Sequence, residues 1–223
     1  MESVPKSGRK SSMKKTAPIA FAGCQLAESR HVCAFFNSDE EAYRVLLPFI
    51  ADGFRCNHKA VHMINPGADI AHRQRLTDSG IDLAGAEQNG QFELRVNTDT
   101  YLQHGRFDPD RMLGVFEGVA ASSLQSPFPL SRIVCSMDWA AGDTACIDQL
   151  IEFESRVNSL WRRTEDAVIC VYNLAKFSGD TVIDIMRTHP MVIIGGMLQQ
   201  NPFYVPPEQF LQELRTRRPP LAL

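Results

Sequence analysis

The sequence predicts a three-layer α/β fold, in which a mostly parallel central sheet is covered by helices on both faces. Between residues 31 and 215, short apolar segments alternate regularly with longer amphipathic segments. This alternation is typical of repeated strand–helix units. The short segments are nearly continuous in hydrophobic residues, as expected of parallel strands that are buried on both faces.

Six strands and six helices are expected from this pattern, because apolar runs indicate strands and apolar positions three and four residues apart indicate helices. In chain order they are strand 31–36, helix 38–53, strand 60–64, helix 70–79, strand 92–96, helix 108–124, strand 132–137, helix 146–161, strand 167–172, helix 181–188, strand 191–194 and helix 207–215. Strand 132–137 is apolar throughout its middle, which predicts a place near the centre of the sheet.

Several helix boundaries are predicted from capping residues. Ser38 and Glu41 have the spacing of a capping box at the start of the first long helix. Asp108 precedes Pro109, which suits an N-cap followed by proline at the first helical position. Pro190 ends helix 181–188, because proline cannot donate a backbone hydrogen bond.

Charge divides the chain into a basic N-terminal segment and an acidic remainder. Residues 1–28 carry five basic and two acidic side chains, whereas the other 195 residues carry 18 basic and 24 acidic ones. An acidic domain argues against direct binding of nucleic acid, which normally needs a basic patch. Since residues 3–15 are rich in Ser, Lys and Gly, we expect residues 1–28 to form a flexible basic tail, residues 29–215 one folded domain, and residues 216–223 a C-terminal tail.

The sequence points to a cytoplasmic protein with no membrane partner. No apolar run reaches about 18 residues, and the six cysteines contain no CxxC pair, which favours a reducing compartment. One alternative stays open at the N-terminus. Lys14-Lys15, the apolar residues 17–22 and Gly23-Cys24 loosely resemble a lipoprotein signal, although the apolar patch is short and contains Pro18.

The first strand-to-helix turn lacks the features of a phosphate-binding loop. Residues 36–41 read Phe-Asn-Ser-Asp-Glu-Glu, with no glycine and no lysine. A nucleotide loop needs glycine flexibility, free backbone amides and a lysine, and carboxylates at a helix N-terminus repel phosphate. No G-x-G-x-x-G motif follows any predicted strand. We therefore expect no nucleotide and no other cofactor.

Three side chains could carry chemistry, and each has a structural alternative. Trp139 follows strand 132–137 and either packs in the core or offers its ring and N–H group to a ligand. Glu154 lies on the apolar stripe of its helix, so it is either buried beside a partner or reaches solvent at the rim. His189 continues an apolar stripe and ends its helix, as a cap or as a pocket residue.

Two familiar kinds of site are not supported by the sequence. His31, Cys33, Cys170 and His189 could be imagined around a metal ion, but their spacing is not a ligand motif, so we expect no metal. Ser/His/Asp catalysis is also unsupported, because no G-x-S-x-G motif is present.

The order of several short motifs resembles one known family. These motifs are His31-Val-Cys-Ala-Phe-Phe, Tyr101-x-x-x-Gly105-x-Phe107-Asp-Pro, Met137-x-Trp139, Glu152-x-Glu154, Cys170-x-Tyr172, Thr188-His189-Pro190 and Asn201-Pro-Phe-Tyr-Val-Pro-Pro207. The chain resembles the MEDS sensory domain, named from methanogen and methylotroph regulators, over about residues 30–215. The resemblance implies a RecA/KaiC-like core with a degenerate nucleotide loop. It also implies sensing of small, hydrocarbon-derived molecules within signal transduction or transcriptional regulation.

The chain departs from the family pattern in two ways. Phe35-Phe36 replaces the usual aromatic–Tyr pair after the first strand, which removes a hydroxyl group. The sequence shows no fused output domain, so we expect a signal to pass to a partner protein, such as a kinase or transcription regulator, or through a homodimer. By the resemblance, the site is expected at His31, Trp139, Glu154, Tyr172 and His189.

We expect a small-molecule sensor without catalytic turnover. Phe36, Trp139 and Tyr172 would form an aromatic wall, and His31, Glu154 and His189 would supply polar contacts, the usual mixture in ligand pockets. Two alternatives remain open. One is an enzyme that uses Glu154 and His189 as an acid–base pair, and the other is an interaction scaffold without a ligand.

Overall fold

A computed structural model describes residues 17–217, apart from the side chains of residues 144 and 145. Its main sheet has seven strands in the order β5-β4-β6-β7-β3-β8-β9. Neighbouring strands are parallel, except that β8 and β9 are antiparallel. The strands are β3 (His31–Phe36), β4 (Lys59–Ile64), β5 (Phe92–Val96), β6 (Ser131–Ser136), β7 (Ala167–Asn173), β8 (Met191–Ile194) and β9 (Met197–Gln200). The predicted mostly parallel sheet is confirmed, and β6 lies in its interior.

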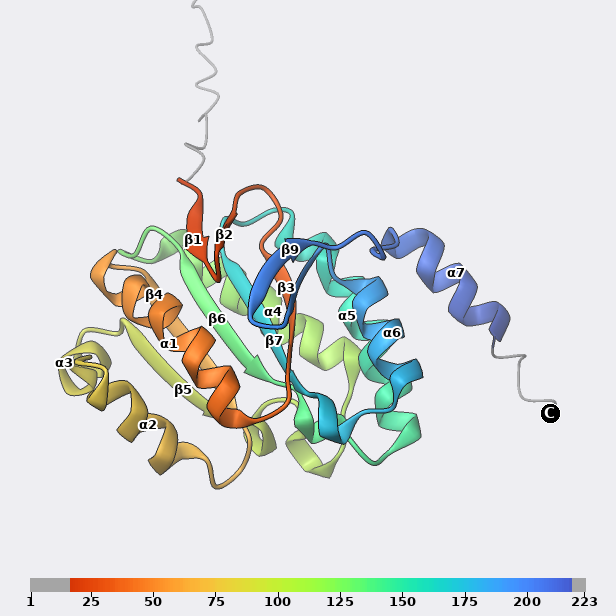
Figure 1. Cartoon of the computed structure of the whole chain (residues 1–223), viewed down its shortest axis with the longest axis horizontal. Helices are drawn as coiled ribbons and strands as arrows, with labels where there is room; N and C mark the ends of the chain where they lie inside the picture. Colours follow the sequence, from red (N-terminus) through yellow and green to blue (C-terminus); the bar gives the residue numbers. More distant parts are fainter. Residues whose placement is uncertain (1–16, 218–223) are drawn as a thin grey trace, which may run out of the picture.

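Helices cover both faces of this sheet, so the three-layer prediction is also confirmed (Figure 1). The face that we call the front carries α1 (Asp39–Arg55), α2 (Asp69–Asp78) and α3 (Leu83–Gln88). The rear face carries α4 (Pro109–Gln125), α5 (Thr144–Trp161) and α6 (Gly179–Thr188). The last helix, α7 (Pro207–Arg217), packs Phe210 and Leu214 against Ile151 of α5 and extends beyond the body of the domain.

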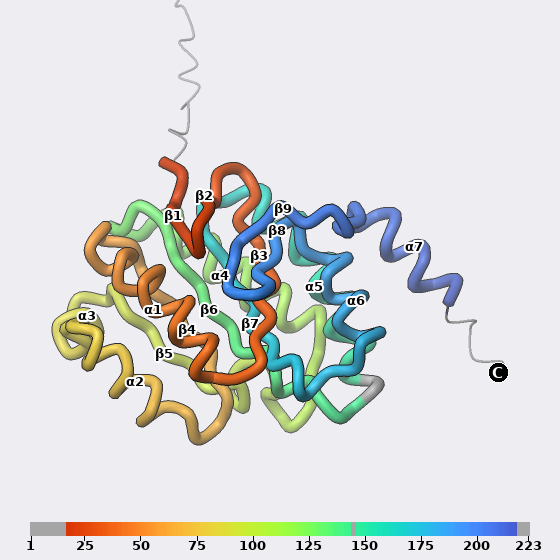
Figure 2. Tube along the Cα trace, viewed as in Figure 1, coloured from red at the N-terminus to blue at the C-terminus, as the bar shows by residue number. Residues whose placement is uncertain are grey.

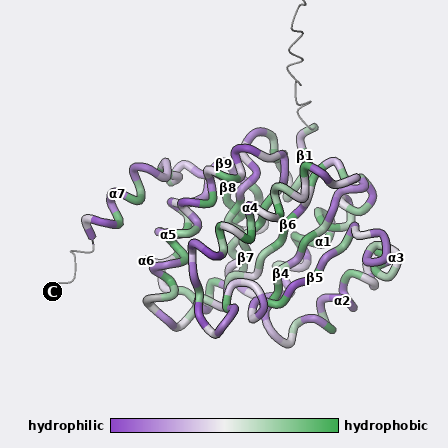
Figure 3. The backbone as a smooth tube through the Cα atoms, turned by 180° about the vertical axis from the view of Figure 1, so that it is seen from behind, coloured by the Kyte–Doolittle hydropathy of each residue, from purple (hydrophilic) through white to green (hydrophobic). Residues whose placement is uncertain are grey.

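Alternating side chains of each strand pack into the two cores. In β3, Val32, Ala34 and Phe36 belong to the front core, while Cys33 and Phe35 belong to the rear core. Because successive strand side chains point to opposite faces, His31 lies on the rear side with Cys33. Figure 3 shows the central strands as mainly hydrophobic, as expected for a sheet covered on both sides.

The predicted caps are present at the helix ends that position the site. Ser38 Oγ accepts a hydrogen bond from the Glu41 amide at 3.2 Å. Glu41 Oε2 accepts a hydrogen bond from the Asn37 amide at 2.8 Å. In a standard capping box this side chain would accept from the amide of the N-cap residue, Ser38, so the contact here is shifted by one residue. Asp108 Oδ1 accepts from the amides of Asp110 and Arg111 at 3.0 and 3.1 Å. His189 is the C-cap of α6.

Part of the predicted N-terminal tail is folded, which corrects the boundary at residue 28. β1 (Ile19–Phe21) and β2 (Cys24–Leu26) form an antiparallel hairpin. The Phe21 ring stacks on Phe49 of α1 with centroids 4.2 Å apart, and the Leu198 amide of β9 donates to the Ala22 carbonyl at 3.0 Å. Figure 2 shows this hairpin beside β9. The remainder of that tail, residues 1–16, and residues 218–223 lie outside the described part of the chain.

Two other elements, α3 and β9, are absent from the sequence prediction. β9 pairs with β8 across a two-residue turn in which Gly195 and Gly196 have φ of 57° and 74°. Positive φ at both central positions is typical of a type I′ hairpin turn and favours glycine. Within the described residues, no helix is long and apolar enough to cross a membrane.

Candidate functional site

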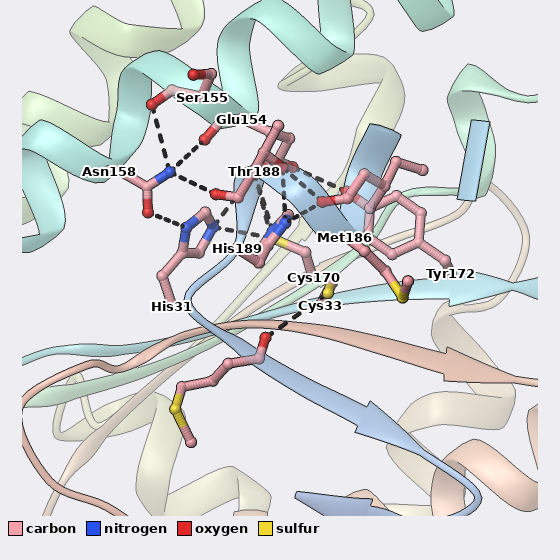
Figure 4. A network of polar contacts seen from close by, with 12 residues as sticks. His31, Cys33, Glu154, Ser155, Asn158, Cys170, Tyr172, Met186, Thr188 and His189 are labelled. Atoms are coloured by element: carbon pink, nitrogen blue, oxygen red, sulfur yellow. Dashed lines mark hydrogen bonds and ion pairs between the residues drawn. The ribbon is translucent and has the colours of Figure 1, made fainter. Parts of the chain in front are cut away.

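A cluster of buried polar side chains lies between the rear face of the sheet and helices α5 and α6. We call it the rear cluster, and it consists of His31, Glu154, Cys170, Tyr172 and His189. β3 supplies His31, α5 supplies Glu154, β7 supplies Cys170 and Tyr172, and the end of α6 supplies His189. Each residue is at most 2% exposed. Figure 4 shows the two imidazole rings lying between Asn158 and Tyr172 in that view.

The Glu154 carboxylate is the centre of the rear cluster. Its Oε2 atom lies 3.3 Å from His31 Nε2 and 3.4 Å from His189 Nε2. Its Oε1 atom accepts a hydrogen bond from the Tyr172 hydroxyl at 3.1 Å. Cys170 Sγ lies 3.8 Å from Oε2 and 3.5 Å from His31 Nε2. Glu154 is therefore the buried carboxylate with partners, one of the two alternatives left open by the sequence.

Hydrogen bonds from Asn158 assign the proton on the His31 ring. Asn158 Nδ2 lies 2.9 Å from the Glu154 carbonyl oxygen and 2.7 Å from the Thr188 carbonyl oxygen, so this atom is the amide nitrogen. Asn158 Oδ1 must then accept from His31 Nδ1, which is 3.0 Å away. In the neutral imidazole, His31 Nε2 therefore carries a lone pair that faces Glu154.

The same reasoning applies to His189. Its Nδ1 atom lies 3.0 Å from the Ile185 carbonyl oxygen, which can only accept a hydrogen bond. The Thr188 hydroxyl donates to that carbonyl at 2.7 Å, so its oxygen accepts from His189 Nδ1 at 2.8 Å. The proton thus resides on Nδ1. Among the described residues, His189 Nε2 has no hydrogen-bond partner, although it lies close to Glu154 Oε2.

Burial and charge set the protonation of the rear cluster. Burial lowers the pKa of His31, and the nearby His189 lowers it further. Burial alone would raise the pKa of Glu154, but the two neighbouring histidines hold it well below its usual range. Burial, with Glu154 adding to it, raises the pKa of the Tyr172 hydroxyl well above its usual range. Burial thus favours a neutral His31 and a protonated Tyr172, whereas positive charge beside Glu154 favours its ionised form.

Asn201, which follows β9, has a local structural role beside His189. Asn201 Nδ2 donates to the Met186 and His189 carbonyl oxygens at 2.6 and 2.7 Å. The Asn201 amide donates to the Pro190 carbonyl oxygen at 3.0 Å. Asn201 therefore ties the end of α6 to the segment after β9 and holds the backbone that carries His189.

The structure does not bring all six predicted ligand-binding residues together. His31, Glu154, Tyr172 and His189 meet in the rear cluster. Phe36 lies on the front face, in the other core, so it cannot share a wall with Trp139 and Tyr172. Trp139 stacks on Tyr101 and contacts Phe107, with ring centroids 4.7 Å apart in both pairs. Within the described chain, Trp139 Nε1 is buried without a hydrogen-bond partner.

Asp138 has the role of a structural acid at the carboxyl edge of the sheet. Asp138 Oδ1 accepts a hydrogen bond from the Asn173 amide at 3.0 Å, and Oδ2 forms an ion pair with Lys176 at 2.8 Å.

A cavity on the front face contains three polar side chains that sequence reasoning missed. We call it the front cavity, with a volume of about 90 Å³ between α1, α2 and strands β4, β6 and β7. The Tyr43 hydroxyl lies 2.7 Å from His72 Nδ1, and His72 Nε2 lies 2.8 Å from His62 Nδ1. These three side chains form a hydrogen-bonded relay along one side of the cavity. Apolar residues line much of the remainder: Ala42, Leu46, Ile50, Ile64, Val134 and Val171.

Both histidines of the front cavity favour the neutral form. Burial, followed by the nearby Arg73, lowers the pKa of His72 to about 4. Burial, followed by His72, lowers the pKa of His62 well below its usual range. His62 Nε2 is buried and has no hydrogen-bond partner among the described residues. A signal for this pair was present, because His62 lies inside an apolar strand and His72 lies four residues before the buried Leu76.

Two larger hollows have less suitable chemistry. The first, of about 260 Å³, is lined by Lys59, Glu93 and Arg95, whose charges already pair with one another. The second, of about 540 Å³, is formed mainly by turns around Ser79–Asp82 and Asn89. The front cavity combines apolar walls with convergent polar groups, as ligand sites usually do.

Comparison with known proteins identifies two similarities. The family model described as MEDS, "MEthanogen/methylotroph, DcmR Sensory domain", matches residues 30–190. The transcriptional repressor DcmR of Methylorubrum extorquens (strain DSM 6343 / CIP 106787 / DM4) is 23% identical over 184 residues, which are 81% of this chain and 66% of that relative. The chain therefore aligns with just under two thirds of the length of that repressor. Both similarities support a sensory or regulatory role.

Proposed function

Since the chain belongs to the MEDS family of sensory domains, we propose that it senses a small, weakly polar molecule that binds in the front cavity. The regulatory role of the similar repressor suits such a function, with the ligand changing how the domain engages a signalling or transcriptional partner. The match to that repressor is distant and covers only part of it. Any inference about the ligand and the partner must therefore come from the residues of this chain.

The hydrogen-bonded relay Tyr43–His72–His62 beside a cavity is the observation that carries the proposal. Residues of the cavity wall lie near the carboxyl ends of β4 and β6, including Asn65 and Ser136. In open α/β sheets, ligands bind beyond the carboxyl ends of the strands. His62 Nε2, without a partner in the described chain, gives the relay one unused hydrogen-bonding atom.

Size and charge define the class of ligand. A cavity of about 90 Å³ has room for only a few water molecules, each of which needs at least about 10–15 Å³ of such space. Two neutral histidines and a tyrosine offer hydrogen bonds but no positive charge, and Asp39 on the cavity wall disfavours anions. We therefore propose an uncharged molecule of a few heavy atoms with one hydrogen-bonding group, such as a small alcohol or aldehyde.

This location differs from the site expected from the sequence. Ligand binding by His31, Phe36, Trp139, Glu154, Tyr172 and His189 stays a prediction, and the two locations can be tested against each other. The acid–base alternative requires a substrate to reach Glu154 and His189, yet both side chains are fully buried. That burial favours a structural role for this pair.

A thermal-shift screen of the whole chain tests the proposal. Small alcohols, aldehydes and halogenated one-carbon compounds would be compared with nucleotides. A ligand at about 10 times its Kd should stabilise the domain by about 1.4 kcal/mol, which is a shift in Tm of about 3–6 °C for a chain of this size. The absence of any stabilising compound across a broad panel would favour the scaffold alternative.

Two matched variants locate the binding site. His72→Gln removes the centre of the front relay and should abolish the shift, whereas Trp139→Phe on the rear face should keep it. The reverse result would move the ligand to the residues predicted from the sequence. Turnover of the stabilising compound by the wild-type protein would contradict a purely sensory role.

A further inference from the structure

We propose that His31, Glu154, Cys170 and His189 of the rear cluster bind one structural zinc ion. The four ligand atoms, two imidazole nitrogens, one carboxylate oxygen and one thiol sulfur, all lie within 4.8 Å of one another. This inference is independent of the proposed function, because the front cavity lies on the opposite face of the sheet.

Four of the six distances between the ligand atoms are close to those of tetrahedral coordination. Zinc bonds of about 2.0–2.1 Å to nitrogen or oxygen and about 2.3 Å to sulfur place neighbouring ligand atoms about 3.3–3.6 Å apart. The distances from Glu154 Oε2 to the Nε2 atoms of His31 and His189 are 3.3 and 3.4 Å. The Cys170 sulfur lies 3.5 Å from His31 Nε2 and 3.8 Å from Glu154 Oε2. An ion at the centre fits these four distances. The other two, from His189 to His31 and to Cys170, are at most 4.8 Å and would shorten as the His189 ring moves toward the ion.

The hydrogen-bond directions favour a cation at this point. Asn158 and the Ile185 carbonyl oxygen hold the ring protons of His31 and His189 on Nδ1. The two Nε2 lone pairs then face the same carboxylate oxygen, which is repulsive unless a positive charge lies between them. Two buried imidazolium rings with centroids 4.1 Å apart would repel each other. A single metal ion satisfies both nitrogens and the carboxylate together.

Charge balance and the surrounding contacts also suit zinc. A Glu154 carboxylate and a Cys170 thiolate would neutralise Zn²⁺, while both histidines stay neutral and the Cys170 proton passes to solvent. Metal-binding histidines usually donate their other ring N–H to a carbonyl or carboxylate oxygen, and both do so here to fixed acceptors. The Tyr172 hydroxyl donates to the second carboxylate oxygen at 3.1 Å and orients it.

The site has the character of a structural centre. The chain supplies all four ligands, and none of them is more than 2% exposed. Structural zinc sites are closed in this way, whereas catalytic sites leave one position for water or substrate. The ligands come from β3, α5, β7 and the end of α6, so the ion would tie two rear helices to the centre of the sheet.

Metal analysis of the whole chain, purified without chelator, tests the proposal. We expect about one zinc ion per chain, as a four-ligand site requires. Exchange for Co²⁺ should give the intense visible bands of a tetrahedral complex and a thiolate-to-cobalt charge-transfer band. A folded protein that contains no zinc and gives no tetrahedral cobalt spectrum would overturn the proposal. Iron or nickel held in place of zinc would overturn the assignment of the metal.

A pair of cysteine variants tests the ligand assignment. Cys33 and Cys170 are neighbours in register on β3 and β7, and both are buried in the rear core, but Cys33 Sγ faces the Met191 carbonyl oxygen. Cys170→Ser should lose the charge-transfer band and weaken zinc binding at least about tenfold, whereas Cys33→Ser should keep both. Equal metal content and equal spectra in the two variants would show adventitious metal and overturn the site. If Cys170→Ser does not fold, the wild-type cobalt spectrum alone decides.

Discussion

Each face of the sheet buries a pair of histidines, and the side chains around the two pairs differ in charge. On the front face, His62 and His72 hydrogen-bond to each other at 2.8 Å beside a cavity. On the rear face, His31 and His189 have no hydrogen bond to each other within the described structure, and both direct Nε2 at Glu154 Oε2. The front pair has a tyrosine as its third member, whereas the rear pair has a carboxylate and a thiol.

This difference shows that a buried histidine pair has no fixed chemical role. A neutral pair that satisfies itself, next to empty space, can exchange hydrogen bonds with a small uncharged guest. A pair whose lone pairs converge on an anion calls for a cation. The neighbouring side chains, more than the histidines, therefore decide what each face can bind.

The largest expected effect comes from neutralising the rear carboxylate. Glu154→Gln should lower the free energy of unfolding by about 3–5 kcal/mol, as breaking a buried ionic group usually does. Glu152→Gln on the same helix is the matched control, because Glu152 pairs with Arg156 at the partly exposed surface and should contribute less than about 1 kcal/mol. Urea unfolding of both variants measures the difference. Equal stability of the two variants would mean that the buried Glu154 carboxylate contributes no more to stability than a surface carboxylate. The rear cluster would then not differ from the front pair in depending on a charged group.

The second prediction concerns the hydroxyl group that orients Glu154. Tyr172→Phe should lower the free energy of unfolding by about 1.5–3 kcal/mol, because a fully buried hydrogen bond to a carboxylate is lost. Tyr204→Phe serves as the control, since its hydroxyl accepts from Arg162 at 3.1 Å on the exposed surface. A Tyr172→Phe protein as stable as the control would mean that Glu154 is neutral in the fold.

Most of the fold could be predicted because the strands are continuous in apolar residues. β3, β5 and β8 have the predicted bounds, and the other predicted strands differ by one residue at one or both ends. β9 was missed because Met197–Gln200 is half polar and its pairing depends on the turn at Gly195-Gly196. The β1–β2 hairpin was missed because its strands have three residues each, too few for a reliable alternating pattern.

The candidate sites were less predictable because their members are far apart in sequence. The apolar stripe of its helix correctly suggested that Glu154 faces inward, but it gave no indication of which side chains meet it. Among the four residues considered for a metal, Cys33 faces the Met191 carbonyl oxygen instead of the cluster. Helix packing brings Glu154 into its place, and a ligand motif read along the chain cannot show this.

The third prediction uses acid to test the front pair. The pKa of His72 is about 4 in the folded protein and about 6.5 when unfolded. As the pH falls from 7 to 5, the unfolded chain binds a proton at His72 before the folded protein does, so the free energy of unfolding decreases. We expect His72 to account for up to about 2 kcal/mol of that decrease. The His72 ring faces Tyr43 of α1 and His62 of β4, with Arg73 nearby. None of these groups favours the charged form of His72.

Urea unfolding of wild-type protein and His72→Gln at pH 7 and pH 5 measures this contribution. The variant should lose less stability over that interval, and the decrease that remains comes from His62 and from carboxylates. Identical losses in the two proteins would indicate that His72 is already protonated in the fold. The front pair would then carry a positive charge, and the chemical distinction between the two faces would disappear.

The smallest expected effect is the counterpart of the tyrosine substitution on the rear face. Tyr43→Phe removes a 2.7 Å hydrogen bond to His72 Nδ1 at a partly exposed position. Water can replace the lost hydroxyl there, and both partners are neutral, so the expected loss is about 1 kcal/mol. Urea unfolding beside Tyr172→Phe gives the comparison directly. If Tyr43→Phe were as destabilising as Tyr172→Phe, the charge of Glu154 would add nothing to the strength of the Tyr172 hydrogen bond. The hydrogen bond of the front relay would then contribute as much stability as that of the rear cluster.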